Sequence, residues 1–158
     1  MVIWFAALSV LMVAVVFKSP AIDYRTVILG AVLPVGEAAL GGPRLLHSVV
    51  GAVLILGVVV LATRNRRLLR RRLLGIPIGL MAHLVLDFSF TRTSIFWWPL
   101  AGTDFAPGQI PELNHLGVSL GLELIGIGVA WWAWKLFGLD DPAKRQRFLS
   151  DGRLDLPT

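Results

Sequence analysis

The 158-residue sequence predicts an all-α fold, a polytopic membrane helical bundle with about five transmembrane segments. Composition and patterning both predict it. Hydrophobic residues make up 56% of the chain and its mean hydropathy is +0.74, above the composition of ordinary globular domains. Its apolar stretches are long, and they lack the period-two alternation that marks the strands of a membrane β-barrel.

The expected transmembrane segments are residues 1–17, 26–42, 45–62, 73–90 and 116–139. An 18-residue helix rises about 27 Å, close to the hydrocarbon thickness of a bilayer. Pro34 and Glu37 interrupt the second segment, so it either spans fully or is broken or re-entrant. The first segment lacks the basic start and the cleavage site of a signal peptide, so we expect an uncleaved span. Residues 1–139 then form one transmembrane domain, and 140–158 a short, partly disordered cytoplasmic tail.

The basic residues orient this bundle. Thirteen of the fifteen lie in the ranges 18–25, 64–72 and 135–153, which alternating helices bring to the same side. Cytoplasmic segments of membrane proteins carry most of the Lys and Arg, so this side is expected to be cytoplasmic. We interpret the six arginines of 64–72 as topology and lipid-anchoring signals. No nucleic-acid binding is expected, because no aromatic or glycine-rich pattern accompanies them.

Polar residues within the apolar segments gather toward the opposite, outer side. His83 and Asp87 are four residues apart and therefore share a helical face, while His47 heads its segment. Glu37 and Glu123 also fall in the outer half. Ionisable groups at membrane depth are costly, so we expect them to converge on one cluster. The chain has no cysteine, and histidine with carboxylate suits a divalent metal such as zinc or manganese.

Structural roles remain open for these residues. His47 could bind lipid headgroups, His83 and Asp87 could lock two helices together, and Glu123 could be the partner of a histidine. A proton or ion pathway is the least favoured function, since the inner halves of the segments carry no acidic residue and no histidine.

Three stretches, "GAVLPVGE", "LLHSVV" and "MAHLVLDFSFTRTSIFWWPL", carry a resemblance that covers residues 28–100. The chain resembles a divergent member of the LexA-regulated, membrane-bound metal-dependent hydrolases of the bacterial inner membrane. That family has a Gly-Ala-x-Leu-Pro-Asp-x-Asp stretch, a Thr-His-Ser, a Gly-His-x-x-x-Asp and an aromatic-Pro-aromatic segment. The matching residues here are Gly30, Ala31, Leu33, Pro34, Glu37, His47, Ser48, His83, Asp87, Trp98 and Pro99.

Two family positions differ. Val35 stands where the family has its first aspartate, and Gly42 stands where it has a histidine five residues before His47. Two ligand-type side chains are therefore missing. Glu112 and His115, in the loop before the last segment, are candidate additional ligands.

The resemblance implies a metal-dependent hydrolase of the inner membrane. The simplest assignment makes His47, His83 and Asp87 the metal ligands and Glu37 a fourth ligand or the general base, with Glu123 as a second catalytic carboxylate. The site would open at the outer leaflet, where a lipid or lipid-linked substrate enters laterally. Its interface and headgroup contacts would come from Trp97, Trp98, Arg44 and Arg92. The competing interpretation is a non-catalytic membrane scaffold or binding protein whose His/Asp/Glu cluster is structural.

Overall fold

The computed structural model describes residues 1–39, 45–102 and 116–156. In these residues the chain forms helices and no strand, so the predicted all-α class is confirmed. The elements are α1 (Val2–Phe17), α2 (Tyr24–Ala39), η1 (Leu45–His47), α3 (Val49–Ala62), α4 (Arg67–Leu73), α5 (Gly75–Leu86), η2 (Ser89–Thr91), α6 (Thr93–Phe96), α8 (Leu116–Leu136) and α9 (Pro142–Asp151).

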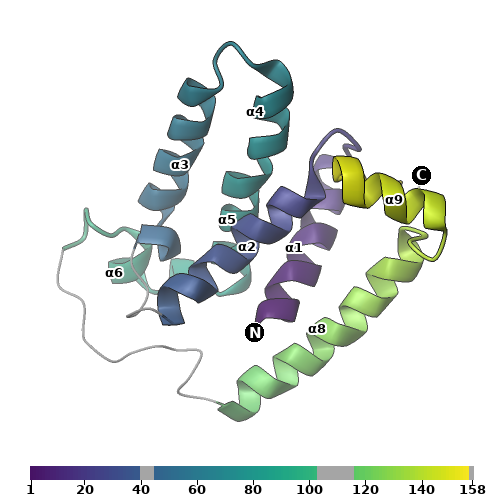
Figure 1. Cartoon of the computed structure of the whole chain (residues 1–158). Helices are drawn as coiled ribbons and strands as arrows, with labels where there is room; N and C mark the ends of the chain where they lie inside the picture. Colours follow the sequence, from purple (N-terminus) through teal and green to yellow (C-terminus); the bar gives the residue numbers. More distant parts are fainter. Residues whose placement is uncertain (40–44, 103–115, 157–158) are drawn as a thin grey trace.

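The long helices run alternately up and down, and α1 lies among them (Figure 1). It packs against α2, α5 and α8, while α2 and α5 make the most extensive contact of the fold. Helix α3 packs on α5 at one edge, and α8 packs on α1 at the other. The connection between α3 and α4 and the helix α9 therefore lie toward one end, and the start of α1 toward the other (Figure 1).

The α2–α5 contact depends on glycines. A Cβ atom on Gly79 would collide with the backbone of Val27, and one on Gly30 would collide with the backbone of Ile76. Only residues without a side chain allow two helix backbones to approach so closely, as in the small-residue interfaces of membrane helices. This approach brings the residues of the candidate site within reach of one another.

The helices differ from the expected segments mainly at their ends. Helix α2 runs continuously through Pro34 to Ala39, so the proline does not break it. The segment expected over 73–90 is helical in α5 and then turns into η2. The segment 45–62 begins as η1, and α3 starts only after Ser48, whose side chain accepts a hydrogen bond from the Gly51 amide as an N-cap.

Several polar side chains are buried beside an apolar core, and many large apolar side chains are exposed. His47, Ser48, Thr63 and His83 are buried to 3% exposure or less. On the outside, α3 and α8 expose long rows of aliphatic and aromatic side chains: Val53, Leu54, Val58, Leu61, Val118, Leu120, Leu124, Ile125, Trp131 and Trp132. Exposed apolar side chains thus form long rows on α3 and α8, whereas exposed apolar patches on water-soluble monomers are usually small.

Within the described residues, one helical stretch is long and apolar enough to cross a membrane by itself, Gly117–Leu136. Helices α1 and α3 are apolar but shorter, at 16 and 14 residues. The structure buries 11% of this long stretch. Length and composition thus identify one candidate span, not five.

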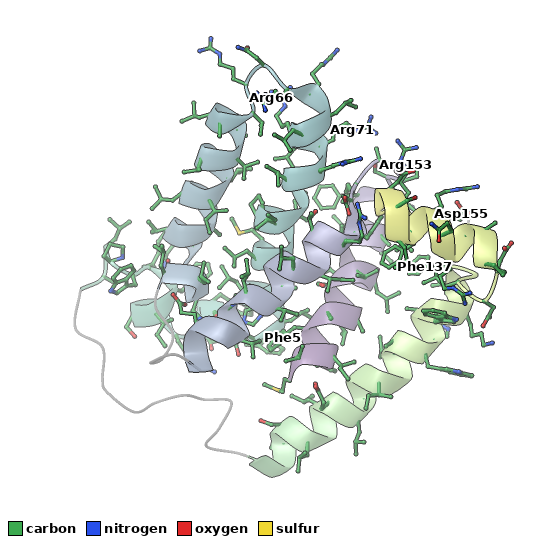
Figure 2. The ribbon with its side chains drawn as sticks, in the orientation of Figure 1. Phe5, Arg66, Arg71, Phe137, Arg153 and Asp155 are labelled. Carbon is green, nitrogen blue, oxygen red and sulfur yellow. The ribbon has the colours of Figure 1, made fainter. Side chains whose placement is uncertain are left out.

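Three of the basic residues lie toward one end of the molecule. Arg66 and Arg71 lie at the end of the molecule where α3 meets α4, and Arg153 lies toward the same end (Figure 2). Phe5 lies toward the opposite end (Figure 2). Within the tail, Pro142–Asp151 form α9, which begins with Asp141 as N-cap and Pro142 in its first turn.

Helix α9 is attached to the start of α2. The Tyr24 amide donates to the Gly152 carbonyl at 2.8 Å, and the Arg25 guanidinium donates to the Leu149 carbonyl at 2.6 Å. Gly152 has a φ of 70°, and a Cβ atom there would collide with the Asp23 carboxylate. Glycine is therefore required at this helix end.

Candidate functional site

The buried imidazole of His83 is the fixed point of the site. It projects from α5, is fully buried, and its Nδ1 lies 2.7 Å from the Ala31 carbonyl of α2. A carbonyl oxygen only accepts, so Nδ1 carries a proton and, in the neutral ring, Nε2 carries the lone pair. Pro34 lies three residues after Ala31 and crowds this turn of α2, where its missing amide also leaves the Gly30 carbonyl without a helical donor.

His47 and Glu37 form the second part of the site. His47 is 3% exposed in η1, and its Nδ1 lies 3.1 Å from Oε2 of Glu37, at the end of α2. Both Glu37 oxygens also face the Leu46 amide, at 3.0 and 3.2 Å. The carboxylate accepts from both groups, so it holds η1 against α2. Nδ1 of His47 carries the donated proton, and Nε2 is again the lone-pair nitrogen of the neutral ring.

The two imidazoles meet edge to face. Their ring centroids are 5.3 Å apart and their planes cross at 86°, and Phe5 of α1 lies against His83 with its ring centroid 4.0 Å away. We call His47 and His83 the histidine pair. The structure therefore brings together residues 36 positions apart in the sequence, with Glu37 behind one ring and Ala31 behind the other.

Asp87 lies one helical turn beyond His83, at the C-terminal end of α5. Its side chain is 7% exposed, and its Oδ2 accepts a hydrogen bond from the Ser89 hydroxyl at 2.7 Å. The Arg92 guanidinium lies 3.9 Å from the same oxygen. Asp87 is thus engaged with η2 and the start of α6.

The histidine pair partly fits a divalent metal. Two imidazoles bound through Nε2 to one tetrahedral zinc, at Zn–N distances of about 2.0 Å, would have ring centroids about 5 Å apart. The observed 5.3 Å is close to this value and is also the usual separation of an edge-to-face ring contact, and both Nδ1 atoms have the carboxylate and carbonyl partners that metal-bound histidines usually have. However, no group of three or more His, Asp or Glu side chains within 1–39, 45–102 and 116–156 is placed to hold one ion.

Glu123 lies on α8 and contacts the first turn of α1. Its oxygens accept hydrogen bonds from the Ile3 and Trp4 amides at 3.2 and 3.3 Å. These amides have no partner within their own helix, so the carboxylate acts as a cap supplied by a neighbouring helix.

The remaining predicted site residues divide into two groups. Arg92 is 37% exposed beside Asp87, and Trp97 is 48% exposed just after α6. Trp98 follows and is half-buried. Arg44, Glu112 and His115 lie outside the residues that the structure describes.

Sequence reasoning did not identify Phe5 or Ser89 as part of the site. Phe5 lies in an uncharged helix with no polar signal, so nothing in the sequence indicated its contact with His83. Ser89 stands two residues after Asp87, close enough in sequence for its hydroxyl to reach the carboxylate, and this spacing was the available signal.

Comparisons of the chain with protein-family models, with curated proteins and with solved structures found no match. The functional argument therefore depends on the geometry of the histidine pair and on the sequence motifs that form it.

Proposed function

We propose that the chain is an integral protein of the bacterial cytoplasmic (inner) membrane, crossing it with α1, α2, α3, α4–α5 and α8. The exposed apolar rows of α3 and α8 support this placement, since water would not tolerate them and a bilayer would. The arginines at the α3–α4 connection would then be cytoplasmic, as would α9. The histidine pair would lie toward the outer leaflet.

We further propose that the protein is a metal-dependent hydrolase of the family that its motifs resemble, acting on a lipid or lipid-linked substrate. The observation that carries this proposal is the histidine pair itself, two buried imidazoles 5.3 Å apart that both turn Nδ1 toward an acceptor. His47 and His83 would contribute two ligands for zinc or manganese. When bound, such an ion activates water and polarises the substrate oxygen.

The chain's own residues would orient the ligands. Glu37 accepts a hydrogen bond from Nδ1 of His47, so the lone pair of Nε2 is the one that would bind the metal ion. The same carboxylate would make this imidazole a stronger ligand, as in other carboxylate–histidine–metal arrangements. Phe5 and the buried setting limit access of bulk water to His83. Arg92, whose guanidinium lies 3.9 Å from Asp87, would hold an anionic headgroup.

A second candidate is a non-catalytic scaffold, and a specific observation favours it. Each acidic residue of the cluster already joins two elements: Glu37 joins α2 to η1, Asp87 joins α5 to η2, and Glu123 joins α8 to α1. In this alternative the histidine pair completes the same set of helix-to-helix contacts and binds no metal.

Metal content separates the two candidates. Detergent-purified protein should contain about one zinc or manganese ion per chain, or regain it when the ion is added after chelation. His83→Ala and His47→Ala should lose it, while Arg70→Ala, far from the pair, should retain it. A native protein that holds no metal and regains none would exclude the metal-dependent hydrolase. If the metal is present, release of fatty acid or phosphate from mixed membrane lipids tests hydrolysis directly.

A further inference from the structure

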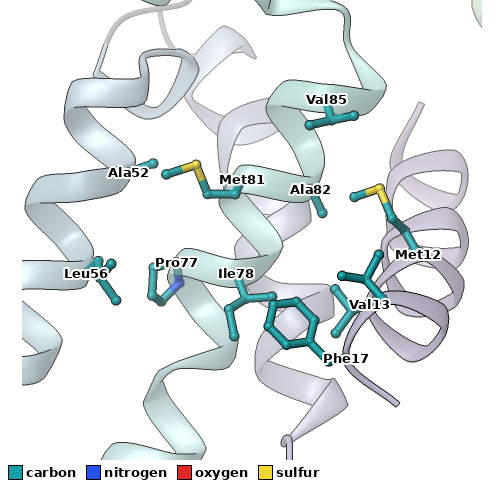
Figure 3. A pocket seen from close by; sticks show the side chains of 11 residues that line it. Met12, Val13, Phe17, Ala52, Leu56, Pro77, Ile78, Met81, Ala82 and Val85 are labelled. Carbon is teal, nitrogen blue, oxygen red and sulfur yellow. The ribbon is translucent and has the colours of Figure 1, made fainter. Parts of the chain in front are cut away.

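An apolar groove runs between α1, α3 and α5 on the side of α5 away from α2 (Figure 3). It encloses about 240 Å³ and is lined almost entirely by hydrocarbon and thioether groups. Its lining includes Met12 and Phe17 of α1, Leu56 of α3, and Ile78, Met81 and Val85 of α5.

This groove is separate from the histidine pair. Met81 and Val85, on α5, line the groove, and His83 lies midway between them in sequence. Two residues of an α-helix turn it by about 200°, so His83 projects from the opposite face of α5. There it meets Ala31 of α2 and Phe5 of α1. The groove and the histidine pair therefore lie on different faces of α5.

At the α4 end of the groove, the helix that carries Ile78, Met81 and Val85 extends into a basic face. Helices α4 and α5 are joined at Leu74, which has helical backbone angles. The Leu74 amide bonds to the Arg70 carbonyl and the Ile78 amide to the Leu74 carbonyl, so the helical hydrogen bonds pass through the joint. Steps of three or four residues then align one face along the combined helix. That face carries Arg67, Arg70, Arg71, Leu74, Ile78, Met81 and Val85.

The cations on this face are uncompensated by acidic side chains. Arg67 and Arg71 are exposed, and Arg70 is half-buried. Among the ion pairs in the described parts of the chain, none involves these three arginines, and the helix that carries them contains no acidic residue. Lys18, exposed, follows Phe17 at the same end of the groove. The arginines of α4 and the apolar groove beside α5 therefore lie along the same side of the combined helix.

We propose that this surface binds an anionic phospholipid of the cytoplasmic leaflet. One acyl chain lies in the groove between α1, α3 and α5, and the headgroup phosphate is held by Arg67, Arg70 and Arg71. Guanidinium groups bind phosphate through paired hydrogen bonds, and basic clusters beside membrane helices attract anionic lipids. The proposal depends on the membrane placement above but not on the metal site, which lies on the other face of α5.

Native mass spectrometry of detergent-purified protein, titrated with phosphatidylglycerol or phosphatidylcholine, tests it. We expect phosphatidylglycerol to bind at least about tenfold more tightly. The variant R67Q/R70Q/R71Q should lose this preference. The variant R64Q/R66Q/R72Q removes the same charge from the same connection but off the groove face, so it should keep the preference. Equal losses in both variants would show diffuse attraction and overturn the proposal.

The acyl chain is tested at exposed positions, where a larger side chain leaves the fold intact. Val16→Trp and Val85→Trp would fill the groove and should weaken phosphatidylglycerol binding about tenfold. Val53→Trp, exposed on α3 outside the groove, should not. Unchanged binding in the first two variants would overturn the proposal. Metal content measured in the same samples should stay unchanged in these variants, which distinguishes the lipid site from the histidine pair. A native protein that stays monodisperse without detergent would refute the membrane placement itself.

Discussion

Nδ1 of His47 lies 3.1 Å from Oε2 of Glu37, across the junction where α2 ends and η1 begins. The carboxylate also accepts from the Leu46 amide, so it fixes both the ring and the backbone of η1. In this arrangement Glu37 holds the His47 ring through Nδ1, and the opposite ring nitrogen, Nε2, is the one that would bind a metal ion. The role proposed for Glu37 is therefore that of a positioning residue.

The first prediction concerns Glu37→Gln. The amide side chain cannot stabilise a charged ring and gives weaker hydrogen bonds, so the buried His47 loses its charged partner. We expect the free energy of unfolding to fall by about 1–3 kcal/mol and metal affinity to fall about 10- to 100-fold. Thermal unfolding in detergent and competition with a chelating dye measure the two effects.

Asp87→Asn is the matched comparison, because it removes the same charge from a carboxylate held by Ser89 and Arg92. The opposite result, loss of metal in Asp87→Asn and full retention in Glu37→Gln, would contradict the positioning role of Glu37. Asp87 would then be the carboxylate that binds the metal, and Glu37 would have a structural role only.

The second prediction concerns topology. The chain contains no cysteine, so single cysteines can be introduced without background labelling. Asn65→Cys, in the α3–α4 connection, should be labelled by a membrane-impermeant maleimide only after cells are opened. Ser94→Cys, exposed in α6, should be labelled in intact cells. Labelling of position 65 from outside would contradict the proposed orientation.

The third prediction concerns the α2–α5 contact. Gly79→Ala places a Cβ atom against the backbone of Val27, which cannot move aside as a flexible side chain would. We expect a loss of about 1–3 kcal/mol in stability, measured by thermal unfolding in detergent. Gly57→Ala makes the same change on α3, where a Cβ atom meets only open space, so stability should stay the same or rise by up to about 1 kcal/mol. A gain in Gly79→Ala as large as that in Gly57→Ala would mean that helix propensity, not close packing, dominates.

The sequence predicted the helical class and the meeting of His47 with His83 because both follow from simple regularities. Apolar stretches of about 18 residues predict helices, and alternating direction brings the start of one and the end of another to the same level. His47 and Asp87 could therefore be placed at the same outer level, with His83 one helical turn below them. The structure adds that the two histidines face each other across η1 and α5.

Side-chain partners were less predictable, because they depend on helix rotation and on turns. Asp87 shares a helical face with His83 by spacing, yet α5 ends at Leu86 and the chain turns into η2, where Ser89 engages the carboxylate. Pro34 was expected to interrupt its segment, yet α2 continues through it. Gly30 and Gly79 allow α5 to approach α2 closely, and the His83 imidazole of α5 then bonds to the Ala31 carbonyl, three residues before Pro34.

The last prediction concerns Glu123, which sequence reasoning grouped with the catalytic carboxylates. Gly126, one turn further along α8, lets that helix approach the backbone of Trp4, so Glu123 reaches the first amides of α1. Glu123→Gln keeps an acceptor oxygen but loses the charge that the helix N-terminus favours, and Glu123→Ala loses both. We expect stability losses of about 1 and about 2 kcal/mol respectively, measured by thermal unfolding in detergent.

Asp140→Asn serves as the control for charge alone. It removes a carboxylate that pairs with Lys135 at the exposed end of α8, where the hydrogen bond from Lys135 keeps the Asp140 pKa below its usual range. That pair is solvent-screened, so the unfolding temperature should change little. Metal content should be unaffected in the Glu123 and Asp140 variants alike. If Glu123→Gln instead left stability unchanged while abolishing hydrolysis, the carboxylate would belong to the catalytic site, and the capping of α1 would be incidental to it.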